Sequence, residues 1–224
     1  MTSYRVARGE IGYFHSERGL TGHEAFTMTS AADGSRTVRA LCRMDDGDLL
    51  RDVTYTVDAD WRPRHAFVQL MLAGRAAGAG WFRFGRESIA FEGVGATGEP
   101  RGALVPVSPA PAVFAPHPLV IDGWQSAAFD PAGPPRQGYH SATCSLEPNG
   151  GSAPFPALTT KVMEFVGRET IEVEAGRFDC DHFLIHPHRK DWTPLEMWVS
   201  GPDRILCRMD WAVRDSSYRL LRRG

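Results

Sequence analysis

Short segments with the composition of β-strands recur along the N-terminal part of this chain, about ten residues apart. Each is rich in β-branched and aromatic residues, and each alternates apolar with polar positions, as a half-buried strand does. Turn signals such as Asp33-Gly34 and Asp46-Gly47 separate them. Helical periodicity is nearly absent, so the pattern predicts an all-β fold. The segments are residues 24–29, 37–44, 50–57, 64–72, 81–84 and 88–93.

The C-terminal third shows the same pattern. Gly167, Ala175-Gly176 and Gly201-Pro202 are turn signals between its segments. We therefore expect six more strands in this part of the chain, at residues 160–166, 169–174, 179–186, 195–199, 205–211 and 217–221.

One pentapeptide, Leu-Cys-Arg-Met-Asp, occurs twice, at residues 41–45 and 206–210. Each copy leads into a turn and a second strand, which predicts two similar hairpins over residues 41–55 and 206–218. Two such hairpins indicate a curved antiparallel sheet with quasi-repeated halves, as in a single barrel or half-barrel. The alternative is coincidence between two hairpins built from similar residues.

The segment between these two parts has a different composition. Twelve of the sixteen prolines lie between residues 100 and 156, and proline cannot donate to a strand ladder. The centre of the segment is too apolar for a solvated linker. We expect residues 100–156 to pack on the barrel or to cover its mouth as a proline-rich connection. A domain boundary here is the rival interpretation. We prefer one domain over residues 1–224, because each half alone would leave sheet edges unpaired.

The stretch from Gly167 to Cys180 resembles a recurrent hairpin in a bacterial family of β-barrel proteins of unknown function, many of them periplasmic. In that family the hairpin precedes a strand ending in Trp-Val/Tyr-Ser, matched here by residues 198–200. The resemblance covers the last third of the chain. It implies a lipocalin-like or half-barrel antiparallel fold and carries no catalytic residues across. This sequence departs from the family in having no apolar secretion signal.

Composition excludes several classes of partner. The net charge of -2 and the pI near 6.4 argue against a nucleic-acid surface. No stretch is long and apolar enough to span a membrane, and four single cysteines are typical of a reduced, cytoplasmic protein. No nucleophile-elbow motif and no phosphate-binding glycine loop occurs, so we expect no cofactor. Nothing in the composition indicates the oligomeric state.

His182, His186 and His188 form the one histidine cluster with a metal-like spacing, since residues of the same parity share a strand face. Pro187 argues against a site, because it ends the strand and turns His188 away. In the simpler interpretation His182 is a half-buried strand residue and the other two are solvated. We predict that the protein holds no stoichiometric metal.

Polar residues on apolar strands form a second set of candidates. If Arg43 and Arg208 point inward, they need a buried partner or an anionic ligand; if outward, they are ordinary surface charges. Aromatic residues of the proline-rich segment would then border the ligand. The residues predicted to contact a ligand are Arg43, His65, Trp124, Phe129, His182 and Arg208.

A third set lies in the proline-rich segment, where His117 and Asp122 precede the run Tyr139-His140-Ser141. A histidine beside an apolar cover can act as a general base, so His117 and His140 are the catalytic candidates. The simpler interpretation is a set of solvated loop residues.

Three functions remain open on this fold. The preferred one is the binding of a small apolar or aromatic molecule in a barrel cavity. The alternative is a cofactor-independent lyase or isomerase that uses histidine or carboxylate acid–base chemistry, and the third is a structural module. A cavity with convergent titratable groups would favour the enzyme, and an apolar cavity with one polar anchor would favour the binder.

Overall fold

One sheet of fifteen strands holds most of the regular structure in the described residues, which are 4–45, 47–186 and 192–224 of a computed structural model. The first eight strands are β1 (Tyr4–His15), β2 (Gly19–Ala31), β3 (Arg36–Met44), β4 (Leu49–Val57), β5 (Pro63–Leu72), β6 (Arg75–Phe84), β7 (Ser88–Val94) and β8 (Pro100–Pro106). The others are β9 (Val113–Ala115), β10 (Arg136–Thr143), β11 (Ala157–Val173), β12 (Gly176–His186), β13 (Leu195–Ser200), β14 (Ile205–Trp211) and β15 (Ser216–Arg223).

Helical structure in the described residues is confined to three short segments. They are α1 (Leu119–Trp124) and the 3-10 turns η1 (Gln125–Ala128) and η2 (Ala212–Arg214). The all-β prediction is therefore confirmed. None of these helical segments is long enough to cross a membrane.

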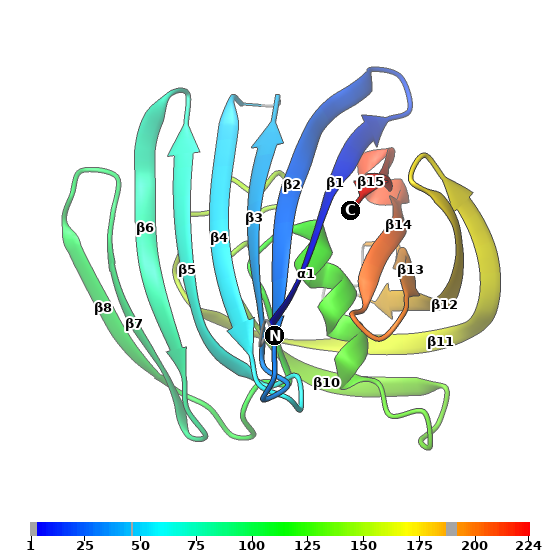
Figure 1. Ribbon diagram of the computed structural model, residues 1–224. Coiled ribbons are helices and arrows are strands. Elements are labelled where there is room, and N and C mark those ends of the chain that lie inside the picture. Colours follow the sequence, from blue (N-terminus) through cyan, green and yellow to red (C-terminus); the bar gives the residue numbers. More distant parts are fainter. Residues whose placement is uncertain (1–3, 46, 187–191) are drawn as a thin grey trace.

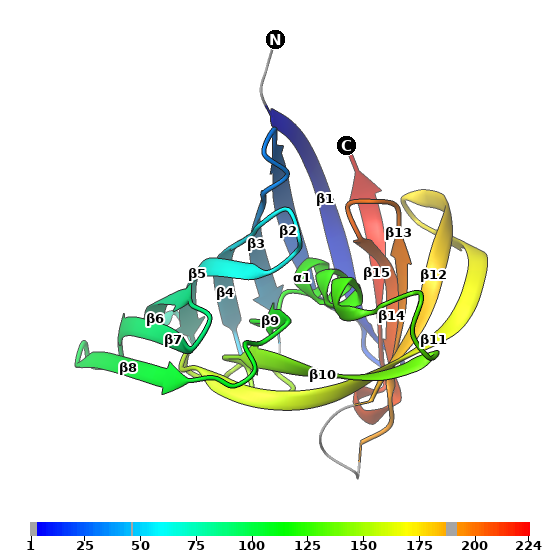
Figure 2. The ribbon, with the colours of Figure 1, turned by 90° about the horizontal axis from the view of Figure 1, so that it is seen from below.

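Within the described residues the sheet is open. Its strands follow the order β8-β7-β6-β5-β4-β3-β2-β1-β15-β14-β13-β12-β11-β10-β9, and every pair is antiparallel except β9 with β10. Strands β8 and β9 lie at the two edges. The sheet curves around α1, which lies on its concave side with strands on three sides (Figures 1 and 2). A closed barrel is thus not formed, and the half-barrel is the better description.

Strict alternation places one face of β3 and of β4 in the core. On β3, Val38, Ala40 and Cys42 are fully buried, whereas Arg39 and Arg43 are exposed. The buried side chains of these strands face α1. One of them is Tyr55 on β4, whose ring centroid lies 5.7 Å from that of Trp124 in α1. Burial of this apolar face stabilises the half-barrel.

Two differences from the predicted strands have clear physical causes. Residues 160–174 do not turn at Gly167: β11 runs through as one strand of 17 residues, with a bulge that leaves Val166 unpaired. The bulge accommodates one extra residue, so Gly167, which we predicted to form a turn, is paired within a continuous strand. The proline-rich segment also contributes strands β8, β9 and β10. Prolines occur at both ends of β8, where they are tolerated because β8 lies at a sheet edge, and β9 and β10 contain none.

The two copies of the pentapeptide lie in β3 and β14, on opposite sides of the β1–β2 pair. Each copy starts a hairpin, and in each the cysteine is buried and the arginine is more exposed than the cysteine. The hairpins are attached differently, because β3 joins β2 by the first strand of its hairpin, whereas the β14–β15 hairpin joins β1 by its second strand, β15.

Arg51, on β4, is fully buried and ties the proline-rich segment to the sheet. Its guanidinium donates from Nε to the carbonyl of Pro116 (2.8 Å), from Nη1 to those of Gly150 (2.8 Å) and Ser152 (3.0 Å), and from Nη2 to that of Cys144 (2.9 Å). The remaining N–H approaches the Cys144 sulfur at 3.2 Å. A buried guanidinium whose five donors all find acceptors avoids the cost of unpaired burial.

Glu24, on β2, fixes the start of α1 in a similar way. Its fully buried carboxylate accepts the N–H groups of Leu119 (2.7 Å) and Val120 (2.9 Å) and the hydroxyl of Tyr13 (2.9 Å). Burial raises the pKa of Glu24, and these donors oppose the rise. Glu24 and Arg51 together set where α1 lies in the concavity.

We predict that Arg51→Met destabilises the protein by at least about 3 kcal/mol, because carbonyls from three points of the connection lose their donor inside the core. Arg39→Met is the matched control: this arginine, on the neighbouring strand, is 68% exposed and pairs with Asp52 on the surface, so its loss should cost less than about 1 kcal/mol. Urea unfolding followed by tryptophan fluorescence measures both. Equal losses in the two variants would contradict the role given to Arg51.

Candidate functional site

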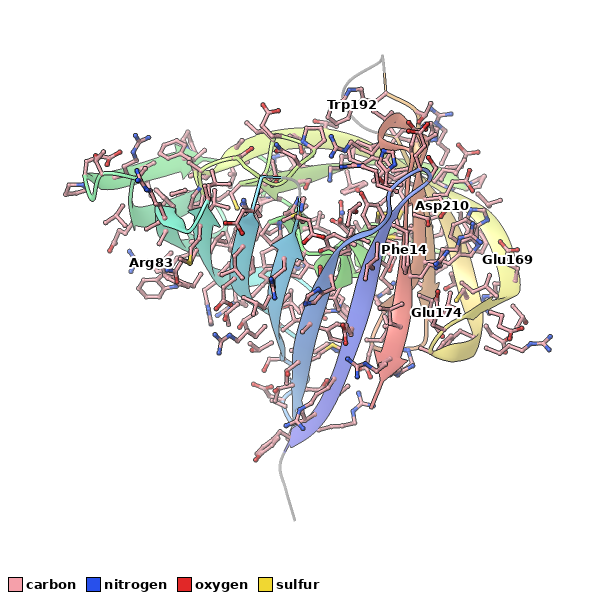
Figure 3. The ribbon with its side chains drawn as sticks, turned by 90° about the horizontal axis from the view of Figure 1, so that it is seen from above. Phe14, Arg83, Glu169, Glu174, Trp192 and Asp210 are labelled. Atoms are coloured by element: carbon pink, nitrogen blue, oxygen red, sulfur yellow. The ribbon has the colours of Figure 1, made fainter. Side chains whose placement is uncertain are left out.

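A cavity of about 190 Å³ lies between α1 and the C-terminal strands, at the end of the molecule that carries the β1–β2 and β14–β15 turns. Much of its wall is apolar. Trp192 and Trp211 meet edge to face there, with ring centroids 5.4 Å apart. Figure 3 shows Trp192 at this end of the molecule. The other large aliphatic side chains of the wall are Met44, Leu119, Leu146, Ile185, Leu195 and Met209.

Four polar side chains form a connected cluster beside the apolar wall. The Gln125 amide nitrogen donates to Oδ1 of Asp122 (2.6 Å), and its oxygen accepts from Nζ of Lys161 (2.9 Å) and from the Tyr139 hydroxyl (3.0 Å). Lysine can only donate, so this contact fixes which end of the amide faces which partner. Asp122, Gln125 and Lys161 line the cavity, and Tyr139 lies behind them in the core.

The cluster holds two ionisable groups in a poorly solvated place. Burial raises the pKa of Asp122 to about 7, although the charge of Lys161 acts to lower it. Burial likewise lowers the pKa of Lys161, against the opposing effect of Asp122. The site therefore contains a carboxyl group that exchanges its proton near neutral pH beside an ammonium group.

His117 also borders the cavity. Its Nδ1 lies 3.3 Å from the Ser145 hydroxyl and its Nε2 lies 3.2 Å from the Met44 sulfur. Burial, followed by the charge of Arg51, lowers the pKa of His117 to about 3, so the ring is neutral at physiological pH. Its backbone φ of 104° is strained for a residue with a side chain. The Arg51 bond to Pro116 on one side and the Glu24 bond to Leu119 on the other hold this conformation.

The structure separates the two catalytic candidates of the sequence analysis. His117 borders the cavity, whereas His140 is exposed on β10, because alternation turns it away from buried Tyr139. The two histidines therefore do not share a site.

The residues predicted to contact a ligand all lie outside the cavity wall. Arg43 and His65 are exposed on the convex face of the sheet. Trp124 is core, with its ring 5.4 Å from that of Trp61, and Phe129 packs on Phe183. These positions follow from strand parity and from α1 packing inward, which the sequence left open.

Arg208 and His182 lie together on the face of the C-terminal strands opposite the cavity. Arg208 pairs with Asp210 at 2.5 Å and lies over the ring of Trp198. The His182 ring also stacks on Trp198, with ring centroids 4.3 Å apart, and its Nδ1 lies 3.0 Å from Oε1 of Glu169. Both side chains therefore contact neighbouring side chains of the sheet and not the cavity.

No group of three or more histidine, cysteine, aspartate or glutamate side chains in the described part of the chain is placed to hold a metal. His186 contacts Glu164 at 2.9 Å instead. His188 and Pro187 lie outside the described residues. The absence of a stoichiometric metal stays a prediction.

Sequence reasoning noticed Asp122 and Tyr139 but missed Lys161 and Gln125. A signal for Lys161 exists. It lies two residues before buried Met163 on β11, and side chains two residues apart on a strand share a face, so Lys161 must face the interior or its rim. Gln125 carries no such signal, because its position depends on how the short helical turn packs.

We predict that Asp122→Asn changes how stability depends on pH. A carboxyl group with a raised pKa binds its proton more tightly in the folded state, so the stability that this group contributes is fully present below pH about 4 and is lost as the pH rises towards 7. Asparagine keeps an oxygen for Gln125 and cannot ionise. The free energy of unfolding of the variant, relative to wild type, should therefore increase by about 2 kcal/mol between pH 5 and pH 8.

Urea unfolding at several pH values measures this difference, and comparison with wild type cancels most of the opposite contribution of His117. A difference that does not change with pH would show that Asp122 ionises as freely in the folded protein as in the unfolded chain.

No family model and no curated protein matches the sequence. Two solved bacterial structures resemble the fold. One is a β-barrel-like protein of the domain of unknown function DUF1849 from Brucella abortus, with 12% identity, a TM-score of 0.59, and coverage of 98% of this chain and 97% of that one. The other is a DUF1089 family protein from Pseudomonas aeruginosa, with 12% identity, a TM-score of 0.54, and coverage of 87% and 90%. The likeness extends over nearly the whole chain and not, as the sequence had suggested, over its last third. At this identity, what is shared is the β-barrel-like fold.

Proposed function

We propose that the protein binds a small organic acid with an aromatic or branched apolar body in the cavity beside α1. The observation that carries the proposal is the polar cluster of Asp122, Gln125 and Lys161 in a cavity whose wall also carries large apolar side chains, among them Trp192, Trp211 and Met209. Small-molecule sites commonly combine such a wall with a few placed polar groups.

The apolar part of the cavity suits a ring or a branched chain. Trp192, Trp211 and Met209 offer flat and polarisable surfaces for it. The volume of about 190 Å³ exceeds that of an engineered cavity of about 150 Å³ that binds benzene. A single aromatic ring with a short acidic side chain therefore fits.

The charge of the site favours an anion. Among the described residues of the wall, Lys161 brings a positive charge into contact with the polar cluster. Asp122 beside it is partly protonated near neutral pH, so it offsets that charge incompletely. Lys161 has three N–H donors, of which one is bound by Gln125. A ligand carboxylate can accept from the others and so replace the hydration that the buried ammonium has lost.

An amine ligand is the competing possibility, with Asp122 as its counter-ion. Phenylacetate, phenethylamine and 2-phenylethanol share one ring and differ in the charge of the head group, so they separate the two cases.

We expect phenylacetate to give a saturable change in tryptophan fluorescence and to bind more tightly than the amine and the alcohol. Lys161→Met should weaken phenylacetate binding by about 10-fold or more, because a charge-assisted hydrogen bond contributes about 1.5–3 kcal/mol. Arg43→Met is the matched control, since this arginine is exposed on the convex face and its loss should leave the affinity unchanged.

If phenethylamine bound more tightly than phenylacetate, the site would select a cation and the proposed organic acid would be wrong. Equal weakening by the two substitutions, or no saturable signal with any of the three compounds, would contradict the proposal.

A further inference from the structure

We propose that the cavity also catalyses proton transfer: Asp122 removes a proton from the carbon next to a ligand carbonyl while Lys161 binds the carbonyl oxygen. The substrate class is a 2-oxo acid with an aromatic or branched side chain, and the reaction is interconversion of its keto and enol forms. This inference rests on the proposed binding function, because the same cavity holds the substrate.

The geometry of the cluster places the two groups on either side of one amide. Gln125 contacts Asp122 through its nitrogen at 2.6 Å and Lys161 through its oxygen at 2.9 Å. The acid and the ammonium are thus held apart by the width of an amide group, and no direct ion pair between them forms. A substrate carbonyl and its adjacent carbon span a similar width, so both groups can reach them at once.

Each group keeps capacity for a substrate. Oδ1 of Asp122 is engaged by Gln125, which leaves Oδ2 as the oxygen that can accept a proton. Lys161 uses one of its three N–H groups on Gln125. Gln125 itself acts as a positioning residue, held by the Tyr139 hydroxyl from behind.

The electrostatic surroundings suit a base that works near neutral pH. The groups that face Asp122 are Lys161 on β11, Glu24 on β2, Tyr139 on β10 and Tyr218 on β15. Lys161 favours the ionised carboxylate and Glu24 opposes it, while the two tyrosines stay neutral because burial raises their pKa. The pKa of about 7 that results for Asp122 is the range in which a general base is most effective.

The chemical step balances without a further reagent. The C–H bond next to the carbonyl breaks and its proton passes to Oδ2 of Asp122. The electron pair of that bond forms the C=C bond of the enol, and the carbonyl π pair moves to the oxygen, where Lys161 supplies a hydrogen bond and the proton. The reverse steps return a proton to the carbon. Neither oxidant nor reductant is needed.

His117, a catalytic candidate from the sequence, also borders this cavity, but it is less suited to act as the base. Its two ring nitrogens face Ser145 and Met44. Its pKa of about 3 makes it a much weaker base than Asp122. The carboxylate is therefore the group to which the geometry assigns the proton transfer.

Deuterium exchange at C3 of phenylpyruvate in D2O, followed by proton NMR, tests the inference on the full chain. Wild-type protein should exchange this position faster than buffer alone, with a rate that rises as the pH passes through about 7. Asp122→Asn should lower the protein-dependent rate by about 100-fold. Its dissociation constant for phenylpyruvate, from tryptophan fluorescence, should stay within about threefold of wild type. Arg39→Met, on the convex face, should exchange like wild type.

The outcomes distinguish the two proposals. Binding of phenylpyruvate with exchange no faster than buffer would overturn the catalytic inference and leave the binding function intact. Exchange by Asp122→Asn at the wild-type rate would overturn the role of Asp122. The absence of both binding and exchange would overturn the two proposals together.

Discussion

The buried guanidinium of Arg51 is the contact on which the arrangement of this half-barrel depends. It belongs to the N-terminal strands, yet it binds carbonyls at residues 116, 144, 150 and 152, which lie before α1, after β10 and before β11. An open sheet has no hydrogen-bonded closure to fix its interior, so a connection that crosses the concavity needs its own anchors. Arg51 supplies one anchor and the Glu24 carboxylate, which binds the start of α1, supplies the other.

The candidate site is a consequence of this anchoring. Because α1 is held against the sheet, Asp122 and Gln125 meet Lys161 from β11 in a place with little water. Desolvation then moves the pKa of the carboxyl group and of the ammonium group towards each other. The strained backbone at His117 has the same origin, since that residue lies between the segments bound by Arg51 and Glu24. Desolvated ionisable groups and strained backbone conformations reduce stability, and they are often found at functional sites.

Much of the fold was predictable, because strand alternation is a local property. The buried and exposed positions of β3 follow directly from the order of apolar and polar residues. The site was less predictable. Arg43 and Lys161 are both cations on strands, and alternation alone does not say which face of either strand is the concave one. The sequence-based choice of Arg43 and Arg208 assumed that repeated residues face the interior. The structure instead buries the cysteine of each copy and leaves Arg43 exposed and Arg208 half-exposed.

What the sequence by itself determined is the period of the side chains: strands with two distinct faces, turns at glycine and aspartate, and an apolar connection that had to be buried. What the tertiary structure alone decided is which side chains from distant strands meet. Asp122 and Lys161 are 39 positions apart and belong to a helix and to a strand. Their encounter depends on the curvature of the whole sheet and on two buried charges that hold the helix within it. Curvature and anchoring arise from the sum of many long-range contacts, so no local pattern of residues records them.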